Sequence, residues 1–226
     1  MYAVLFIFAA LAVVLWETPV IYPVKLFVVF LHEISHGLAA VLTGGKIVQI
    51  EVNQQLGGIC YTQGGSQFIV ASAGYIGSIF WGAMILLLSS RTRFYKLGAF
   101  FIGAVLIFIS LLYVSNSFGI TFGVGFGILL IFVAKFAPGV INKFILQFIG
   151  IVSCFYVLID IKEDLFSFEH RVTDAQILAN MTHIPAIIWA IIWMVISFFT
   201  VWFAIKHSHP SSNEPSSVSR DTMSNS

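Results

Sequence analysis

Long apolar segments separated by short polar ones occupy almost the whole chain. A membrane-spanning helix needs about 20 mainly apolar residues, and the bilayer core offers no water to satisfy exposed backbone groups. The apolar pattern therefore predicts an all-α polytopic membrane protein with about seven transmembrane helices, the first of them short. The predicted spans cover approximately residues 2–16, 25–42, 68–88, 97–114, 120–134, 141–165 and 184–205.

One segment between the second and third spans departs from this pattern. Residues 46–52 alternate polar and apolar side chains, and residues 57–62 have a similar composition before Gly64 and Gly65. Alternation is typical of half-buried strands and glycines mark turns, so the segment from about 45 to 65 predicts a short β-hairpin. A lone hairpin is only marginally stable and must rest on the helices. It is either a loop that closes a site or an edge to which an extended substrate adds a strand.

Composition supports the membrane assignment. The 226 residues are 59% hydrophobic and 9% charged, and the mean hydropathy is +0.98, whereas soluble domains are about 25% charged. A net charge of +1 without a basic cluster predicts no binding of nucleic acid. Cys60 and Cys154 are far apart and indicate neither a disulfide nor a cysteine zinc site. We expect a multi-pass protein of the lipid bilayer, in the cell membrane if bacterial, with one domain over 1–206 and a disordered tail over 207–226.

The basic residues are distributed unevenly over the predicted loops. With seven spans, most Lys and Arg residues fall on one side of the membrane. The positive-inside rule then places the N-terminus outside and the tail inside. The second and sixth spans run parallel in this arrangement, so that their last turns lie on the same side of the membrane.

The most informative motif lies within the second span. Residues 27–40 are apolar apart from His32, Glu33, Ser35 and His36. Positions i and i+4 share one face of a helix, so the two histidines can present imidazole nitrogens to a single Zn²⁺. Glu33 then stands beside the open position of the metal, as the base that takes a proton from water. Charged groups at membrane depth cost about 2.5–3.5 kcal/mol and normally mark function, although a buried polar helix contact is the alternative.

A catalytic zinc site of this kind needs a third protein ligand. Asp160 lies at the end of the sixth apolar span, and Asp164 follows one turn later on the same face. Asp160 is nearer to membrane depth and is the predicted ligand, with Asp164 as the alternative and an interfacial capping acid as the other interpretation. Asn116, at the end of the fourth span, is predicted to be a helix cap or, as a second choice, a substrate contact.

Small residues recur at helical spacing near the start of the third span, in the segment 71–78. Small side chains let helix backbones approach closely where no hydrophobic force drives association in lipid. We therefore expect the third span to pack against the second along this segment.

Four segments in one order resemble the site-2 protease family of intramembrane zinc metallopeptidases, and most closely its small B-like branch. They are His-Glu-Ile-Ser-His-Gly at 32–37, Thr-Gly-Gly at 43–45, the small-residue segment at 72–78 and the acidic segment at 160–164. The resemblance covers about residues 25–193. It implies zinc held by His32, His36 and an Asp of a later span, Glu33 as catalytic base, and cleavage of a transmembrane segment of another protein. It also implies that the hairpin helps to present the unwound substrate.

The sequence therefore predicts a membrane-embedded zinc metalloendopeptidase that hydrolyses a peptide bond in or near a transmembrane segment of a membrane-protein substrate. Two alternatives stay open: a non-proteolytic protein that binds or transports a divalent metal, and a pseudo-protease that binds client helices. A transporter is expected to carry polar residues on several spans and often internal repeats. The third, fifth and seventh spans are nearly free of ionisable groups, which favours the peptidase. The retained Glu33 speaks against the pseudo-protease.

Overall fold

The computed structural model describes residues 2–91, 94–166 and 173–208, with side chains for 4–90, 94–162 and 173–208. The predicted disordered tail therefore lies, from residue 209 on, outside the described residues. Helices dominate the fold, and one two-stranded sheet follows the second of them. The elements are α1 (Tyr2–Val14), α2 (Tyr22–Leu42), β1 (Lys46–Val52), β2 (Gly58–Gln63), α3 (Gln67–Arg91), α4 (Tyr95–Tyr113), α5 (Ser117–Phe136), α6 (Gly139–Phe166), α7 (Asp174–Thr182) and α8 (Ala186–His207).

Six of the described helices, α2, α3, α4, α5, α6 and α8, are long and apolar enough to cross a membrane. They agree with the second to seventh predicted spans. The first predicted span is shorter than the others: α1 has 13 residues, which rise about 20 Å against a hydrocarbon core of about 30 Å. Six spans with a short additional helix are close to the predicted seven, and the chain is a multi-pass membrane protein.

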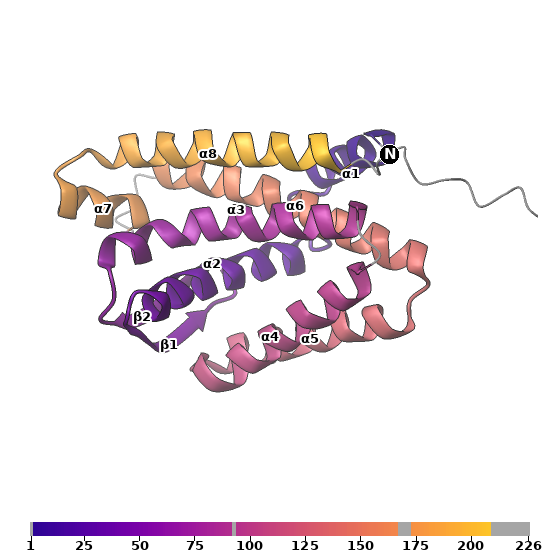
Figure 1. Cartoon of the computed structure of the whole chain (residues 1–226), viewed down its shortest axis with the longest axis horizontal. Coiled ribbons are helices and arrows are strands. Elements are labelled where there is room, and N and C mark those ends of the chain that lie inside the picture. The colour runs from indigo at the N-terminus through magenta and orange to yellow at the C-terminus, as the bar shows by residue number, and fades with distance from the viewer. Residues whose placement is uncertain (1, 92–93, 167–172, 209–226) are drawn as a thin grey trace, which may run out of the picture.

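The directions of the helices bear on two topological predictions. Figure 1 shows the start of α1 and the end of α8 at the same end of the molecule. The prediction that the N-terminus and the tail lie on opposite sides of the membrane required α1 to be a full crossing, and the 13 residues of this helix do not support that requirement. Figure 1 also shows α2, α4 and α6 running in one direction and α3, α5 and α8 in the other. The parallel course of the second and sixth spans is thus confirmed.

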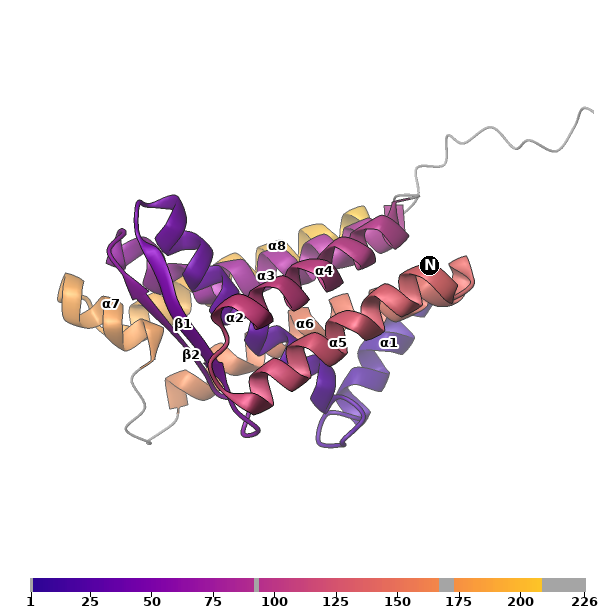
Figure 2. The same ribbon diagram turned by 90° about the horizontal axis from the view of Figure 1, so that it is seen from below.

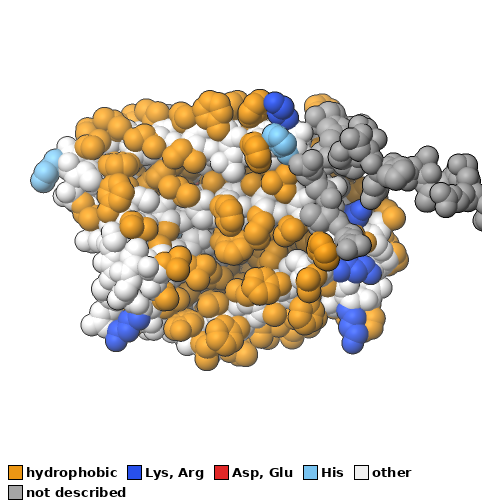
Figure 3. All heavy atoms as spheres, in the orientation of Figure 1, with side chains coloured by type: hydrophobic (Ala, Val, Ile, Leu, Met, Phe, Trp, Pro, Cys, Tyr) orange, Lys and Arg blue, Asp and Glu red, His pale blue; other side chains and the backbone are white. Residues whose placement is uncertain are grey.

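The surface has the distribution expected for lipid contact. On the face shown in Figure 3, hydrophobic side chains cover the middle of the molecule, and Lys and Arg side chains lie toward its two ends. Large apolar residues such as Phe132, Phe198 and Phe199 are more than half exposed. In a bilayer these side chains face acyl chains instead of water, so their exposure costs little.

The motif helix α2 is the central helix of the bundle. Of its apolar window 78% is buried, compared with 17% for α8. On one side, Phe27 stacks on Phe126 of α5 with ring centroids 5.0 Å apart. On the other side, Gly77 of α3 lies so close to Ser35 that a Cβ at this position would collide with the Ser35 hydroxyl. The predicted packing of small residues of the third span on the second is therefore confirmed.

The hairpin predicted over 45–65 is present as the antiparallel pair β1 and β2. Ile50 pairs with Cys60 and Val52 with Gly58, and the register shifts between Ile47 and Gln49. Figure 2 shows the hairpin beside the C-terminal half of α2, between α7 and the connection from α4 to α5. That connection also pairs with the sheet, through an isolated parallel bridge between Ile50 and Val114.

Asn116 occupies the N-cap position of α5 but makes no capping hydrogen bond with its side chain. Its amide group instead binds the backbone of Val52 in β1. The predicted cap is therefore wrong in this respect: the side chain fixes the sheet and not the helix end.

Between the sixth and seventh predicted spans the chain forms the additional short helix α7. Thr173 precedes this helix, and its side-chain oxygen accepts a hydrogen bond from the Gln176 backbone N–H at 3.3 Å. Leu178 and Ala175 are buried, and the Trp189 indole of α8 donates to the Thr182 hydroxyl at 3.2 Å. The short helix is thereby fixed against the end of the bundle, where α3 and α8 border it (Figure 1).

Candidate active site

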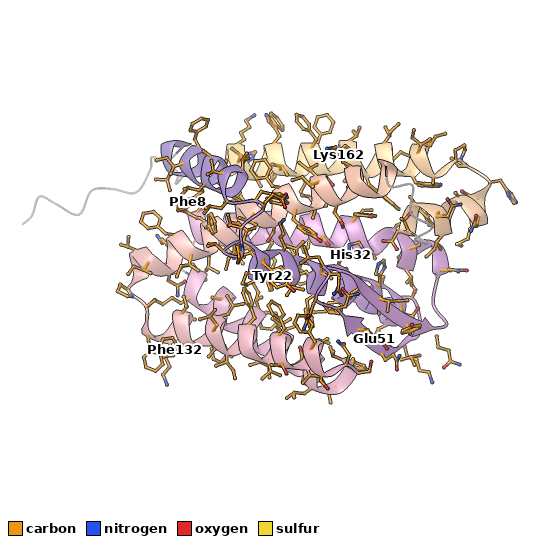
Figure 4. The ribbon with its side chains drawn as sticks, turned by 180° about the vertical axis from the view of Figure 1, so that it is seen from behind. Phe8, Tyr22, His32, Glu51, Phe132 and Lys162 are labelled. Atoms are coloured by element: carbon orange, nitrogen blue, oxygen red, sulfur yellow. The ribbon has the colours of Figure 1, made fainter. Side chains whose placement is uncertain are left out.

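The two motif histidines lie side by side in the middle of α2. His32 and His36 are one turn apart, about 15 and 21 Å from the start of the helix, and their ring centroids are 4.8 Å apart. Both imidazole rings line a cavity that α3 and the hairpin also border. Figure 4 shows His32 inside the bundle, at the end that also carries Glu51 of the hairpin. The sequence-based prediction that these imidazoles share one face is confirmed.

The carboxylate of Asp174, the first residue of α7, completes the group. Its Oδ2 atom lies 3.1 Å from His32 Nε2 and 3.3 Å from His36 Nε2. Among the described residues, these are the His, Cys, Asp and Glu side chains that offer three ligand atoms within 4.8 Å of one another. The exposed fractions of the side chains are only 16%, 9% and 12% for His32, His36 and Asp174. Two imidazole nitrogens and one carboxylate oxygen at this spacing suit a divalent metal such as zinc.

A hydrogen bond orients the second imidazole. His36 Nδ1 lies 2.7 Å from the carbonyl oxygen of Val70 in α3, so in the tautomer that donates this bond its Nε2 is unprotonated and directed at Asp174. Metal-binding histidines commonly donate their second N–H to a carbonyl in this way, which fixes the ring and makes the ligating nitrogen more basic.

A glycine of α3 makes room for the three groups. A Cβ on Gly74 would collide with His32 Nε2 and lie 2.6 Å from Asp174 Oδ2. Tyr75, the next residue, places its ring edge-on to His32 with centroids 5.0 Å apart. The α3 backbone therefore forms one wall of the ligand group, and the neighbouring aromatic ring limits the rotation of the imidazole.

The ionisation of Asp174 suits cation binding. Burial raises the pKa of this carboxyl, but the charge of His36 and hydrogen bonds with His32 and His36 lower it by more, so that its pKa lies below the usual range. The group is therefore a carboxylate at neutral pH, which is the form that a metal requires.

A cavity of about 320 Å³ adjoins the ligand group, and Glu33 is part of its wall. Glu33 is only 5% exposed, and Gly58 of β2 covers its carboxylate: a Cβ on Gly58 would lie 2.5 Å from Glu33 Oε1. Further lining residues come from α3, α6, α7 and the hairpin: Val70, Ala71, Tyr75, Tyr156, Asp160, Thr173, Asp174, Ile177, Leu56, Ile59, Cys60 and Thr62. The hairpin contributes residues of β2 to this wall and none of the described residues of β1.

The structure places the predicted third ligands differently from the sequence analysis. Asp160 lines the same cavity, but its carboxylate does not belong to the group of described ligand atoms around the two imidazoles. Asp164 lies in the last turn of α6, where the side chains are outside the described residues. Asn116, the second-choice substrate contact, is not among the described residues that line the cavity.

The comparison with protein families matches the model described as Peptidase M50B-like to residues 4–204. The chain belongs to this family. The resemblance of the sequence to the B-like branch of the site-2 protease family is therefore confirmed, and the kind of function is that of a membrane metallopeptidase. Comparisons with curated proteins and with solved structures gave no match.

Asp174 is the one residue of this ligand group that the sequence analysis of the M50B-like chain did not single out. Two signals in the sequence point to it. Thr173 and Gln176 have the spacing of a capping box, which predicts a helix beginning at Asp174. Apolar residues then recur at Ala175, Leu178 and Met181, a helical period with one face to bury. The depth of that helix in the bundle, however, depends on tertiary packing.

Proposed function

We propose that the chain is an intramembrane zinc metallopeptidase that hydrolyses a peptide bond in or near a transmembrane segment of a membrane-protein substrate. The observation that carries the proposal is the convergence of His32, His36 and Asp174 beside Glu33, in a cavity lined by α2, α3, α6, α7 and the hairpin. Membership of the Peptidase M50B-like family supports the reaction class.

The residues fit zinc in number, type and orientation. Three protein ligands leave one position open, as in catalytic zinc sites. The Asp174 oxygen is nearly equidistant from the two Nε2 atoms. His36 has its other nitrogen occupied by the Val70 carbonyl. In the proposed site His32, His36 and Asp174 are the ligands, and Asp174 takes the role that the sequence analysis gave to Asp160.

Glu33 is the proposed general base. It follows His32 on α2 and lines the cavity next to the ligand group, so that it can take a proton from the attacking water and pass it to the leaving amine. Zn²⁺ bound here would polarise the scissile carbonyl and lower the pKa of water. The low exposure of Glu33 keeps bulk water away from the carboxylate and strengthens its interactions with the reacting groups.

Among the described residues, β1 is the only strand that pairs with β2, and the other edge of β2 supports a role of the hairpin in presenting substrate. The backbone of Ile50 and the backbone of Val52 are bonded on the side of the α4–α5 connection. In an antiparallel ladder their partners Cys60 and Gly58 then direct their backbone groups to the opposite, cavity-lining edge. An extended substrate segment can pair with this edge beside Glu33. A helical substrate must unwind first, because its own hydrogen bonds occupy its carbonyl oxygens.

The first test is the Glu33→Gln variant. It should keep close to one zinc per chain, because Glu33 is not a ligand, and should lose peptidase activity by about 10²–10⁴-fold, the usual contribution of a general base. The assay uses the purified full chain in liposomes together with a panel of single-span membrane proteins tagged at both ends. Zinc content is measured on the same preparations.

Two results would contradict the proposal. One is a wild-type protein that holds no zinc after expression in metal-replete medium. The other is equal cleavage by wild type and Glu33→Gln, which would show that cleavage in the assay does not come from this site.

A second prediction concerns the contact between the hairpin and the base. In Gly58→Ala, the new methyl group would lie 2.5 Å from Glu33 Oε1 and 2.7 Å from its Cγ, so the flexible carboxylate must move. A displacement of about 1 Å can cost about 100-fold in rate, and we expect a loss of this size with normal zinc content. Gly57→Ala is the matched control, because the three atoms nearest to a Cβ at that position all belong to the exposed Asn53 side chain and not to Glu33. Equal activity of the two variants would show that Gly58 does not hold the base in place.

A further inference from the structure

The connection between α4 and α5 behaves as a third strand of the sheet. Val114 forms a parallel bridge with Ile50, and the Ser115 N–H donates to the Ile50 carbonyl oxygen at 3.0 Å. Asn116 continues the pairing with its side chain. Its Nδ2 donates to the Val52 carbonyl oxygen at 2.7 Å, and its Oδ1 accepts from the Val52 N–H at 3.2 Å. The outer edge of β1 is therefore occupied as far as its last residue.

A line of contacts leads from Asn116 to the proposed catalytic base. Asn116 binds the backbone of Val52, Val52 lies opposite Gly58 in the β1–β2 register, and Gly58 lies against the Glu33 carboxylate. Asn116 itself is on the far side of β1 from the cavity and touches no ligand of the metal group. Any effect of this side chain on the reaction must therefore pass through the hairpin.

The other end of this line is fixed to the motif helix. Phe122 and Phe126 of α5 stack on Phe30 and Phe27 of α2, with ring centroids 5.8 and 5.0 Å apart. The α4–α5 connection is thereby held at a set distance from the helix that carries Glu33. Because the hairpin is bound to this connection, its distance from α2 is fixed as well. A two-stranded hairpin alone is too weakly stable to keep a fixed position.

We propose that Asn116 is a positioning residue, which holds Val52 and through it the β2 edge at the place where a substrate strand meets Glu33. The proposal rests on the peptidase function put forward above. It assigns to Asn116 the selection of the bond that is cut, because the register of a strand paired with Gly58 and Cys60 determines which carbonyl lies beside the base.

The test is the Asn116→Ala variant of the full chain in liposomes, with a single-span test protein that the wild type cleaves. We expect zinc content to stay at the wild-type level and KM to rise about tenfold, equivalent to about 1.4 kcal/mol, with a smaller change in kcat. We also expect cleavage at neighbouring bonds in addition to the wild-type bond, measured by mass spectrometry of the products. The Val52 amide should exchange with solvent at least about tenfold faster in the absence of substrate.

Two further variants separate positioning from folding. Asn116→Asp has the same size and keeps the acceptor for the Val52 N–H, but turns a carboxylate oxygen toward the Val52 carbonyl, and it should show the same defects. Ser115→Ala removes the hydroxyl that contacts Glu51 at 3.2 Å and leaves the backbone bond to Ile50, so it should behave as wild type.

The proposal is overturned if either Asn116 variant retains zinc and has the wild-type KM and a single cleavage position. Loss of zinc in both variants would also overturn it, since Asn116 would then be required for the fold and not for positioning. A wild-type protein that binds zinc but cuts no test protein would instead remove the peptidase function. The Val52 exchange rate distinguishes this case, because it reports on the Asn116 bonds without any substrate.

Discussion

The Asp174→Asn variant should lose its metal and its activity together. Asn keeps the shape of the side chain but removes the negative charge that lies 3.1 and 3.3 Å from the two imidazole nitrogens. Loss of a partner in the outer shell of a metal site typically costs 10–100-fold in affinity, and loss of a direct ligand should cost more than about 100-fold. Zinc content by elemental analysis and cleavage in liposomes measure both effects on one preparation.

Asp160→Asn is the matched control for this prediction. Asp160 is also an aspartate in the wall of the cavity, but it is not one of the grouped ligand atoms, so the variant should retain zinc. Asp164→Asn should retain it as well. Full zinc in Asp174→Asn together with loss of zinc in Asp160→Asn would return the third-ligand role to Asp160, as the sequence analysis predicted.

The comparison of these aspartates shows what the sequence can and cannot predict here. His32, Glu33 and His36 form a local motif, because i and i+4 always share a helix face. The proposed third ligand, Asp174, is not local: it lies 138 positions after His36 in the chain. The sequence analysis ranked the aspartates by their distance from an apolar segment, which is a measure of membrane depth only for residues on a spanning helix. Asp174 lies on α7, which is not one of the membrane-spanning helices. It reaches the site because α7 packs on α3 and α8.

The same reasoning explains why α1 was predicted to be a full membrane span. Its composition is as apolar as that of the full spans, and hydropathy alone cannot distinguish a helix that crosses the bilayer from one that covers part of its thickness. In the structure, Phe8 of α1 packs edge-on against Phe144 and Phe148 of α6, and Trp16 after the helix covers the buried Lys25 ammonium at 4.3 Å. Lys25, near the start of α2, thus makes a cation–π contact.

The position of the hairpin in the chain could be predicted from the sequence, but its contacts could not. Alternation over 46–52 and the glycines at 57 and 58 fix two short strands. The importance of Gly58 and Asn116 depends on which side chains lie opposite them, namely Glu33 and the backbone of Val52. From the sequence alone, Gly58 is interpreted as a turn residue. The structure shows that it lies against the buried Glu33 carboxylate, where a larger side chain would collide.

Gly74→Ala should abolish zinc binding through sterics alone. The added Cβ would collide with His32 Nε2 and lie 2.6 Å from Asp174 Oδ2. These two atoms are proposed ligands of the metal. His32 cannot swing freely away, because the ring of Tyr75 stands edge-on to it. Either the ligands separate or α3 moves away from α2, and in both cases the three donor atoms lose their spacing. We expect zinc content and cleavage to fall as far as in Asp174→Asn.

Two control variants decide whether the loss comes from the ligands or from helix packing in general. Gly77→Ala lies one turn along the same interface, and its Cβ would collide with Ser35, which is not a ligand; it should lower the thermal stability but keep the zinc. Gly125→Ala, at a helix position with nothing within 4 Å of the new methyl group, should change neither. If Gly77→Ala lost zinc as completely as Gly74→Ala, the effect would belong to the separation of α2 and α3, and the specific role of Gly74 in making room for His32 and Asp174 would be refuted.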